Sequence, residues 1–253
     1  MRLLVSVSDA AEARAALAGG AQIVDAKDPA RGTLAPLTPA LLRAVREAVP
    51  AEVPLSAALG DAGTVAELAA RVEGITVTLS FVKLGFRGFP SPRAAAAVLA
   101  GLAELARSLP GSPGVIAVAY ADWERVGSLP VEVFPALVGE CGGAGLLVDT
   151  ALKDGTTLFD WMSVSDLGRV GAEVLKVAPE FALAGSLGVE HLALARSAGA
   201  TVVGVRGAAC DGGRRGRVSE ARVAQLARSF SARPSTSSSP TTDQGIAAAA
   251  REK

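Results

Sequence analysis

The chain has 253 residues, half of them hydrophobic, and a formal net charge of zero. A chain of this length can bury one large core, and its neutral balance lacks the basic excess with which domains bind nucleic acid. No apolar run reaches the ~18 residues that a membrane span requires.

Cysteine and histidine are scarce. The two cysteines and the single histidine (Cys141, Cys210 and His191) follow no spacing typical of a metal site or a disulfide framework. We therefore expect no metal and no cofactor. The N-terminal segment MRLLVSVSDA lacks the long apolar region of a secretory signal and favours a buried first strand, so a cytoplasmic protein with reduced thiols is predicted.

Apolar runs of strand length alternate with segments of helical period along most of the chain. Such continuous apolar runs are typical of parallel strands covered by helices. The predicted strands are residues 3–7, 23–26, 55–59, 81–84, 115–120, 146–149, 181–184 and 202–205. The helix between residues 121 and 145 is the weakest, because Pro130 and Pro135 interrupt its pattern.

Eight strand–helix units predict an α/β fold, a single-domain TIM (β/α)8 barrel over residues 1–230. The alternative is a doubly wound open sheet. It is disfavoured because the first strand leads into VSVSDAAEA, which carries no glycine fingerprint for a dinucleotide. Residues 231–253 are rich in Ser, Thr and Pro, and they are predicted to form a mostly disordered tail.

Lysine is rare beside arginine, with five lysines against twenty arginines. Three of the five, Lys27, Lys83 and Lys153, fall at or just beyond the ends of predicted strands. Arginine keeps its proton in proteins, whereas a desolvated lysine can lose it and act as a nucleophile or a base. These three lysines are therefore candidates for chemistry.

Two aspartates accompany the lysines. Asp25 precedes Lys27 by two residues and so shares its face of an extended strand, while Asp149 ends the sixth strand just before Lys153. The carboxyl ends of barrel strands meet at one mouth, so all five groups are expected there, where crowded cations and burial depress the pKa of an amine. The alternative is two ordinary rim ion pairs, Asp25–Lys27 and Asp149–Lys153, of little energetic weight.

Glycine-rich segments follow the last two strands, where barrels commonly bind phosphate through backbone N–H groups. The candidate phosphate-binding residues are Gly185, Ser186, Gly204, Arg206 and Gly207. Arg206 could add a bidentate clamp. The run GGRRGR at residues 212–217 is either a basic flap over a phosphorylated substrate or a solvated loop.

Several segments, taken in order, resemble one known family. They are LLVSVSDAAEARAALAGGAQIVDAKDPARGTLA, FVKLGF, VAYAD, LLVDTALKDGTTLFDWMS, FALAGS and VVGVRGAACDGG. Together they resemble the (5-formylfuran-3-yl)methyl phosphate synthases of methanofuran biosynthesis, also called 4-(hydroxymethyl)-2-furancarboxaldehyde-phosphate synthases. The resemblance extends from about residue 2 to about residue 230 and leaves only the tail outside it.

The resemblance implies a TIM-barrel lyase that condenses two molecules of glyceraldehyde 3-phosphate into a furan aldehyde phosphate, with loss of phosphate and water. It implies that Lys27 forms a Schiff base and that Asp25, Lys83, Asp149 and Lys153 complete the active site. It adds the identity of the substrate, which the residues alone do not give. We also expect a homo-oligomer, with no nucleic-acid or membrane partner.

Two other functions stay open. The D-x-K element in VDAKDP is similar to that of barrels that decarboxylate or epimerise sugar phosphates without a Schiff base, although Ala30 and Arg31 stand where those need a further aspartate. A barrel that only binds a phosphorylated ligand is the other possibility.

Overall fold

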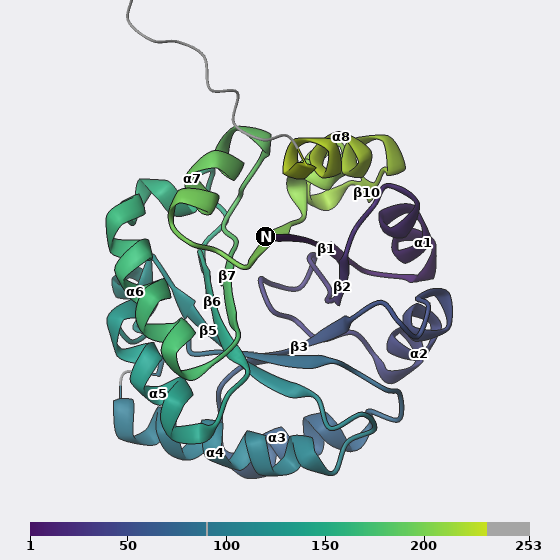
Figure 1. The fold of residues 1–253 in the computed structure, drawn as a ribbon. Helices are drawn as coiled ribbons and strands as arrows, with labels where there is room; N and C mark the ends of the chain where they lie inside the picture. Colours follow the sequence, from purple (N-terminus) through teal and green to yellow (C-terminus); the bar gives the residue numbers. More distant parts are fainter. Residues whose placement is uncertain (90, 232–253) are drawn as a thin grey trace, which may run out of the picture.

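Eight parallel strands close into a barrel in which the first strand pairs with both the second and the eighth (Figure 1). The computed structural model describes residues 1–89 and 91–231, so the predicted tail lies almost wholly outside the described residues. The strands are β1 (Arg2–Val7), β2 (Ile23–Ala26), β3 (Leu55–Asp61), β4 (Phe81–Gly85), β5 (Gly114–Tyr120), β6 (Gly145–Asp149), β7 (Glu180–Leu183) and β8 (Val202–Val205). The predicted single-domain TIM barrel is confirmed.

Helices surround this barrel on the outside (Figure 1). They are α1 (Ala10–Ala18), α2 (Pro39–Ala48), α3 (Val65–Glu73), α4 (Pro92–Arg107), α5 (Phe134–Cys141), α6 (Val164–Val177), α7 (Leu192–Ser197) and α8 (Glu220–Ser231). Most of the longer helices begin at a side chain that accepts a backbone N–H of the first turn, the usual N-cap. These caps are Asp9, Thr38, Thr64, Ser91 and Ser163.

The segment between β5 and β6 contains the helix that the sequence predicts least clearly. Two 3₁₀ turns, η1 (Trp123–Val126) and η2 (Val131–Val133), occupy its first half. Pro130 immediately precedes the second of these turns, and Pro135 lies in the first turn of α5, where its missing N–H costs no helical hydrogen bond. The prolines therefore shorten this helix and move its start toward β6.

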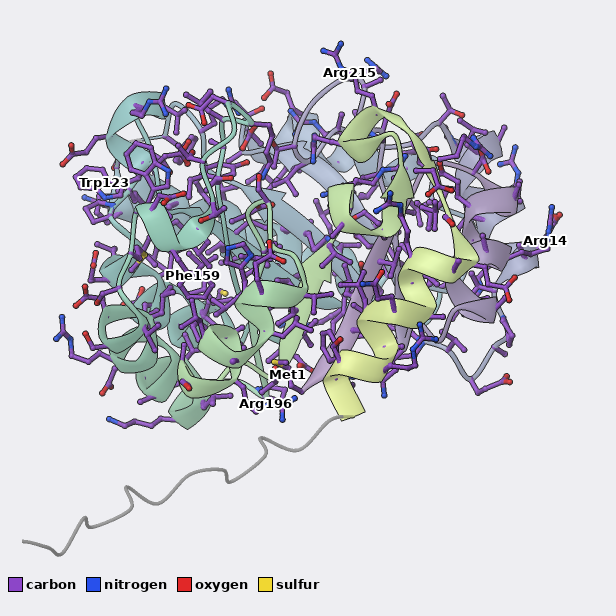
Figure 2. The ribbon with its side chains drawn as sticks, turned by 90° about the horizontal axis from the view of Figure 1, so that it is seen from above. Met1, Arg14, Trp123, Phe159, Arg196 and Arg215 are labelled. Carbon is purple, nitrogen blue, oxygen red and sulfur yellow. The ribbon has the colours of Figure 1, made fainter. Side chains whose placement is uncertain are left out.

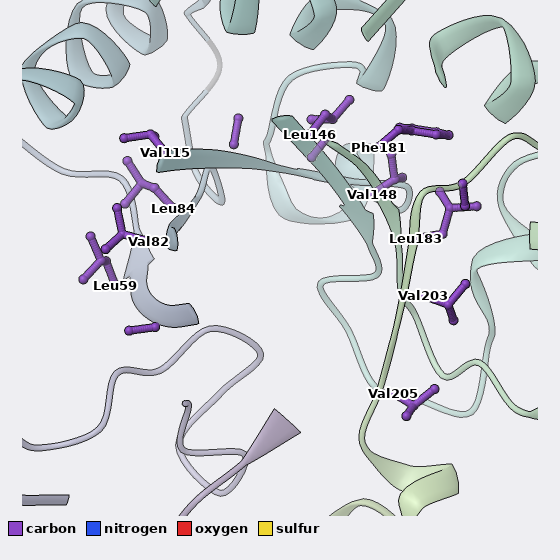
Figure 3. Close-up of a cluster of buried hydrophobic side chains, with 14 of the residues drawn as sticks. Leu59, Val82, Leu84, Val115, Leu146, Val148, Phe181, Leu183, Val203 and Val205 are labelled. Carbon is purple, nitrogen blue, oxygen red and sulfur yellow. The ribbon is translucent and has the colours of Figure 1, made fainter. Parts of the chain in front are cut away.

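The outward face of the strands forms the main hydrophobic core against the helices (Figure 3). In β7, Phe181 and Leu183 are fully buried on this face. Gly171 of α6 lies directly against the Phe181 ring, because a Cβ at that position would be 2.5 Å from a ring carbon. A glycine here lets the helix approach the strand closely, so this position depends on the missing side chain.

The inward face of the strands changes character along the barrel axis. Below the carboxyl ends lies an apolar layer, with Ile23, Ile116 and Leu147 in one buried cluster, while Glu180 at the amino end of β7 also lines the cavity and pairs with Arg2. Two residues further along β2 and β6 come Asp25 and Asp149, because alternate residues of a strand share a face. The charged groups therefore lie on an apolar floor inside the barrel.

A short hairpin lies between β8 and α8. Its strands β9 (Cys210–Asp211) and β10 (Arg217–Val218) pair antiparallel, and they enclose most of the predicted basic flap. Figure 2 shows Arg215 of this hairpin at one end of the molecule and Met1, with the last turn of α8, toward the other. The hairpin thus lies at the carboxyl ends of the strands.

Within the described ranges every helix is too short or too polar to span a bilayer. The expected cytoplasmic location and self-association stay predictions.

Candidate active site

A cavity of about 260 Å³ extends from the carboxyl ends of the strands down the barrel axis. All ten residues that the sequence singles out line it. They are Asp25, Lys27, Lys83, Asp149, Lys153, Gly185, Ser186, Gly204, Arg206 and Gly207. The fold therefore gathers the lysines, the aspartates and the glycine-rich loops around one space.

Asp25 is fully buried and is held by groups from three other strands. Its register neighbours on β1 and β3, Ser6 and Ser56, donate their hydroxyl groups to its carboxylate at 2.9 and 2.7 Å. The ammonium of Lys83 forms an ion pair with the same carboxylate. Burial alone would raise the pKa of Asp25, but the Lys83 and Lys27 ammonium groups hold it below its ordinary value.

Asp149 forms the second ion pair of the cavity. Its carboxylate lies 2.7 Å from the Lys153 Nζ, which also donates to the Thr150 hydroxyl at 3.0 Å. Burial raises the pKa of Asp149, whereas the Lys153 and Lys27 ammonium groups outweigh burial and lower it. Asp122 orients the loop that carries Lys153, because its carboxylate accepts the N–H groups of residues 151 and 152 at 2.6 and 2.9 Å.

Lys27 has no such partner. It is only 6% exposed. Among the described residues, no carboxylate lies within ion-pair distance of the Lys27 Nζ, and no group accepts a hydrogen bond from it. Burial lowers the pKa of Lys27 to about 8, against the opposing effect of Asp25 and Asp149. Of the two rim ion pairs considered from sequence, Asp149–Lys153 forms, whereas Asp25 pairs with Lys83 instead of Lys27.

The loops after β7 and β8 present free backbone donors to the cavity. Gly185 and Ser186 both have positive φ, 109° and 54°, which turns the chain sharply after β7. Within the described part of the chain, the N–H groups of Ser186, Gly207 and Ala208 have no hydrogen-bond acceptor. A cluster of unpaired N–H groups beside a cavity suits an anion.

Two of the predicted phosphate-binding residues have another environment. Gly204 lies within β8, paired in register with Leu4, so it provides space in the barrel rather than a loop. Arg206 is buried, and all five of its N–H donors are used by protein acceptors, including both carboxylate oxygens of Glu12 at 2.5 and 3.1 Å. Arg206 could clamp a phosphate only by breaking these bonds, so its contacts do not support the phosphate-binding role expected from the sequence.

Sequence reasoning overlooked Ser6, Ser56 and Glu12. The two serines have a visible signal, since each is a hydroxyl residue inside an otherwise apolar strand (LLVSV and PLSAAL). Glu12 has none, because an acid in the first turn of a helix is usually a solvated group that favours the helix dipole.

The protein family described as 4-HFC-P synthase matches residues 3–227 of this chain. The chain belongs to this family. Among its relatives, a Methanocaldococcus jannaschii protein named (5-formylfuran-3-yl)methyl phosphate synthase is 36% identical over 234 residues, which cover 89% of this chain and 98% of that protein. A Methanopyrus kandleri protein of the same name is 38% identical over 220 residues, covering 85% and 92%. The family resemblance inferred from the motifs is thus confirmed.

Solved structures share the fold of this 4-HFC-P synthase family member at low sequence identity. Phosphoribosylanthranilate isomerase from Thermotoga maritima aligns with a TM-score of 0.58 and 14% identity, covering 91% of this chain and 98% of that chain. A 3-hexulose-6-phosphate synthase aligns with a TM-score of 0.57 and 15% identity, covering 90% and 99%. These similarities establish the barrel and nothing more specific.

Proposed function

We propose that this chain condenses two molecules of glyceraldehyde 3-phosphate into (5-formylfuran-3-yl)methyl phosphate through a Schiff base on Lys27. The name of the relatives supports the product. The observation that carries the mechanism is the amine of Lys27, which lies unpaired in the cavity with a pKa of about 8 between two ammonium–carboxylate pairs. About a tenth of such an amine is neutral at pH 7, and the neutral form attacks an aldehyde.

In the first half of the proposed reaction, the Lys27 Nζ forms a bond to the aldehyde carbon and the carbonyl oxygen leaves as water. The resulting iminium acidifies the adjacent C–H, and a carboxylate takes that proton. The electron pair then expels the phosphate one carbon further along, which makes the enzyme a carbon–oxygen lyase. The enol left by phosphate loss then attacks, through its terminal carbon, the central carbonyl carbon of a second molecule that has isomerised to the ketone. The free primary hydroxyl of that second molecule closes the ring onto the central carbon of the first, and with hydrolysis of the imine two molecules of water are lost overall to give the furan.

The ion-paired groups have complementary parts in this scheme. Lys83 and Lys153 are each ion-paired with a carboxylate inside the cavity, so they suit proton donation to departing oxygen atoms and neutralisation of phosphate. Asp25 and Asp149 keep their charge at neutral pH because their pKa values are lowered, so they suit proton acceptance. The free N–H groups after β7 and β8 suit one substrate phosphate.

Trapping the Schiff base tests the proposal directly. Borohydride added to the protein with glyceraldehyde 3-phosphate should attach one substrate-derived carbon chain to Lys27, as read by peptide mass spectrometry. Lys27→Ala should lose the label and lower the rate of furan formation by roughly a thousandfold or more. Lys176→Ala is the matched control, because Lys176 lies on the surface in an exposed pair with Glu173.

The same assay separates the alternatives. Furan absorbance together with free phosphate, from glyceraldehyde 3-phosphate alone, is expected only of the synthase. A sugar-phosphate decarboxylase or epimerase would give neither signal and no borohydride adduct, and a binding protein would retain the substrate unchanged. Full labelling of the Lys27→Ala protein would move the nucleophile to another lysine.

A further inference from the structure

The cavity has a second arginine besides Arg206. Arg214, in the turn between β9 and β10, lines the cavity next to the loops that hold Ser186 and Gly207. The backbone of Arg214 passes directly over Gly207: a Cβ on that glycine would lie 3.6 Å from the Arg214 backbone nitrogen. The side chain therefore enters the cavity from the hairpin, beside the unpaired N–H groups.

The guanidinium of Arg214 is incompletely satisfied. In the described part of the chain it makes one hydrogen bond, from Nη2 to the Gly32 carbonyl at 3.2 Å, and no ion pair. Burial lowers the pKa of Arg214, and Asp149 is the main group that opposes this effect. A half-buried guanidinium with most of its donors free and no carboxylate partner is suited to an anionic ligand.

Arg206 and Glu12 hold the turn that carries Arg214. Two of the five Arg206 donors go to the carbonyls of Arg214 and Gly216, at 3.3 and 2.9 Å, while two others go to the Glu12 carboxylate. On the other side of the hairpin, Arg217 forms a two-bond contact with Asp9, at 2.5 and 3.1 Å. The hairpin is thus fastened to the start of α1 by two acids, one buried and one at the surface.

From this arrangement we propose that Arg214 binds the phosphate group of the substrate, together with the free N–H groups after β7 and β8, and that the Arg206–Glu12 pair positions it. Arg214 then fills the role that the sequence suggests for Arg206. Its bond to Gly32, in the loop after β2, links the hairpin to the loop following Lys27 across the mouth. The inference rests on the proposed function only in taking the substrate to be a phosphate monoester.

The first test compares neighbouring arginines. Arg214→Ala should weaken the binding of inorganic phosphate, measured by calorimetry, by roughly tenfold or more, since a charge-assisted fork is lost. Arg215→Ala is the matched control, because Arg215 is exposed and projects from the end of the molecule (Figure 2). It should change phosphate affinity less than twofold. Equal losses in the two variants would overturn the proposal, because they would reflect the general field of the hairpin.

A second measurement isolates the phosphate from the aldehyde. Borohydride trapping of glyceraldehyde, which lacks the phosphate, should proceed in Arg214→Ala as in the unchanged protein, whereas trapping of glyceraldehyde 3-phosphate should need a higher concentration. If the unchanged protein makes no furan but its phosphate affinity depends on Arg214, the proposed function fails and this inference stands. If furan forms in Arg214→Ala with an unaltered KM, this inference fails and the function stands.

A double-mutant cycle tests the positioning pair. Glu12→Gln should weaken phosphate binding severalfold in the unchanged protein but have no further effect when Arg214 is already alanine. Arg206→Lys serves the same purpose if the Glu12 variant does not fold. Additive losses in the double variant would overturn the positioning role, since a purely structural change would act independently of Arg214.

Discussion

The outward and inward faces of the barrel strands have different functions, although successive residues of each strand point alternately to one face and the other. The outward face of β7 carries Phe181 and Leu183, which pack against helices, while the inward face of β2 carries Asp25 and Lys27. Outward residues bury apolar surface, which stabilises the fold by about 25 cal/mol per Å². Inward residues at the carboxyl ends bury charge, which costs stability unless it is paired. We therefore expect substitutions on the outward face to change mainly the stability of the fold, and substitutions at the carboxyl ends of the inward face to change mainly the reaction.

The largest effect on stability is expected on the outward face. Phe181→Ala should lower the free energy of unfolding by about 3–5 kcal/mol, because it leaves a cavity under α6. Urea unfolding followed by circular dichroism measures this loss. Schiff-base trapping per folded molecule should be unchanged, and its loss in the folded fraction would break the separation between the two faces.

On the inward face, Lys27 should make stability depend on pH. Its pKa is about 8 in the folded chain against an ordinary value of 10.5, so between these values the unfolded chain binds a proton that the folded chain lacks. The free energy of unfolding should therefore rise with pH across this window. Lys27→Met should be the more stable protein at pH 7, with a difference that shrinks toward pH 10.5.

Urea titrations of both proteins at several pH values measure that difference. Lys176→Met is the control, since an exposed lysine should leave the pH profile unchanged. A constant difference between the Lys27→Met protein and the unchanged one would mean that the Lys27 ammonium is not destabilised by burial.

The smallest effect is expected at the inward-facing Gly204. A Cβ there would lie 3.4 Å from both Ala184 and Leu4 side-chain atoms, which is ordinary contact, so Gly204→Ala should change stability by less than about 1 kcal/mol. Gly145→Ala is the contrast, because its Cβ would lie 2.2 Å from the Glu180 carbonyl oxygen. Thermal melting should place the second variant clearly below the first, and equal melting temperatures would contradict this reading of the barrel interior.

The barrel fold and the residues that line its mouth were predictable because both follow from the periodicity of the sequence. Continuous apolar runs indicate strands that are buried on both faces. Because every second residue of a strand points to the same face, Asp25 and Lys27 must share one face. The partner of Asp25 was not predictable. Lys83 reaches it from β4, two strands away, because side chains of alternate strands share a layer inside a closed barrel. That layering depends on strand tilt, which the sequence does not display.

The roles of Arg206 and Arg214 were likewise not predictable from the sequence. From position alone Arg206 is a better phosphate ligand than Arg214, since it directly follows a strand. Its actual environment depends on Glu12, 194 residues away in the chain. Only the closure of β8 onto β1 brings the two together, and no local pattern reports that contact.

The arrangement of the chain ends has a practical consequence for handling the protein. Met1 and the last turn of α8 lie toward the face opposite the one from which Arg215 projects (Figure 2). A tether attached at Met1 or just after α8 would therefore hold the barrel with its cavity facing outward. Proteins immobilised in this way on a sensor surface should keep the mouth open to small phosphorylated molecules.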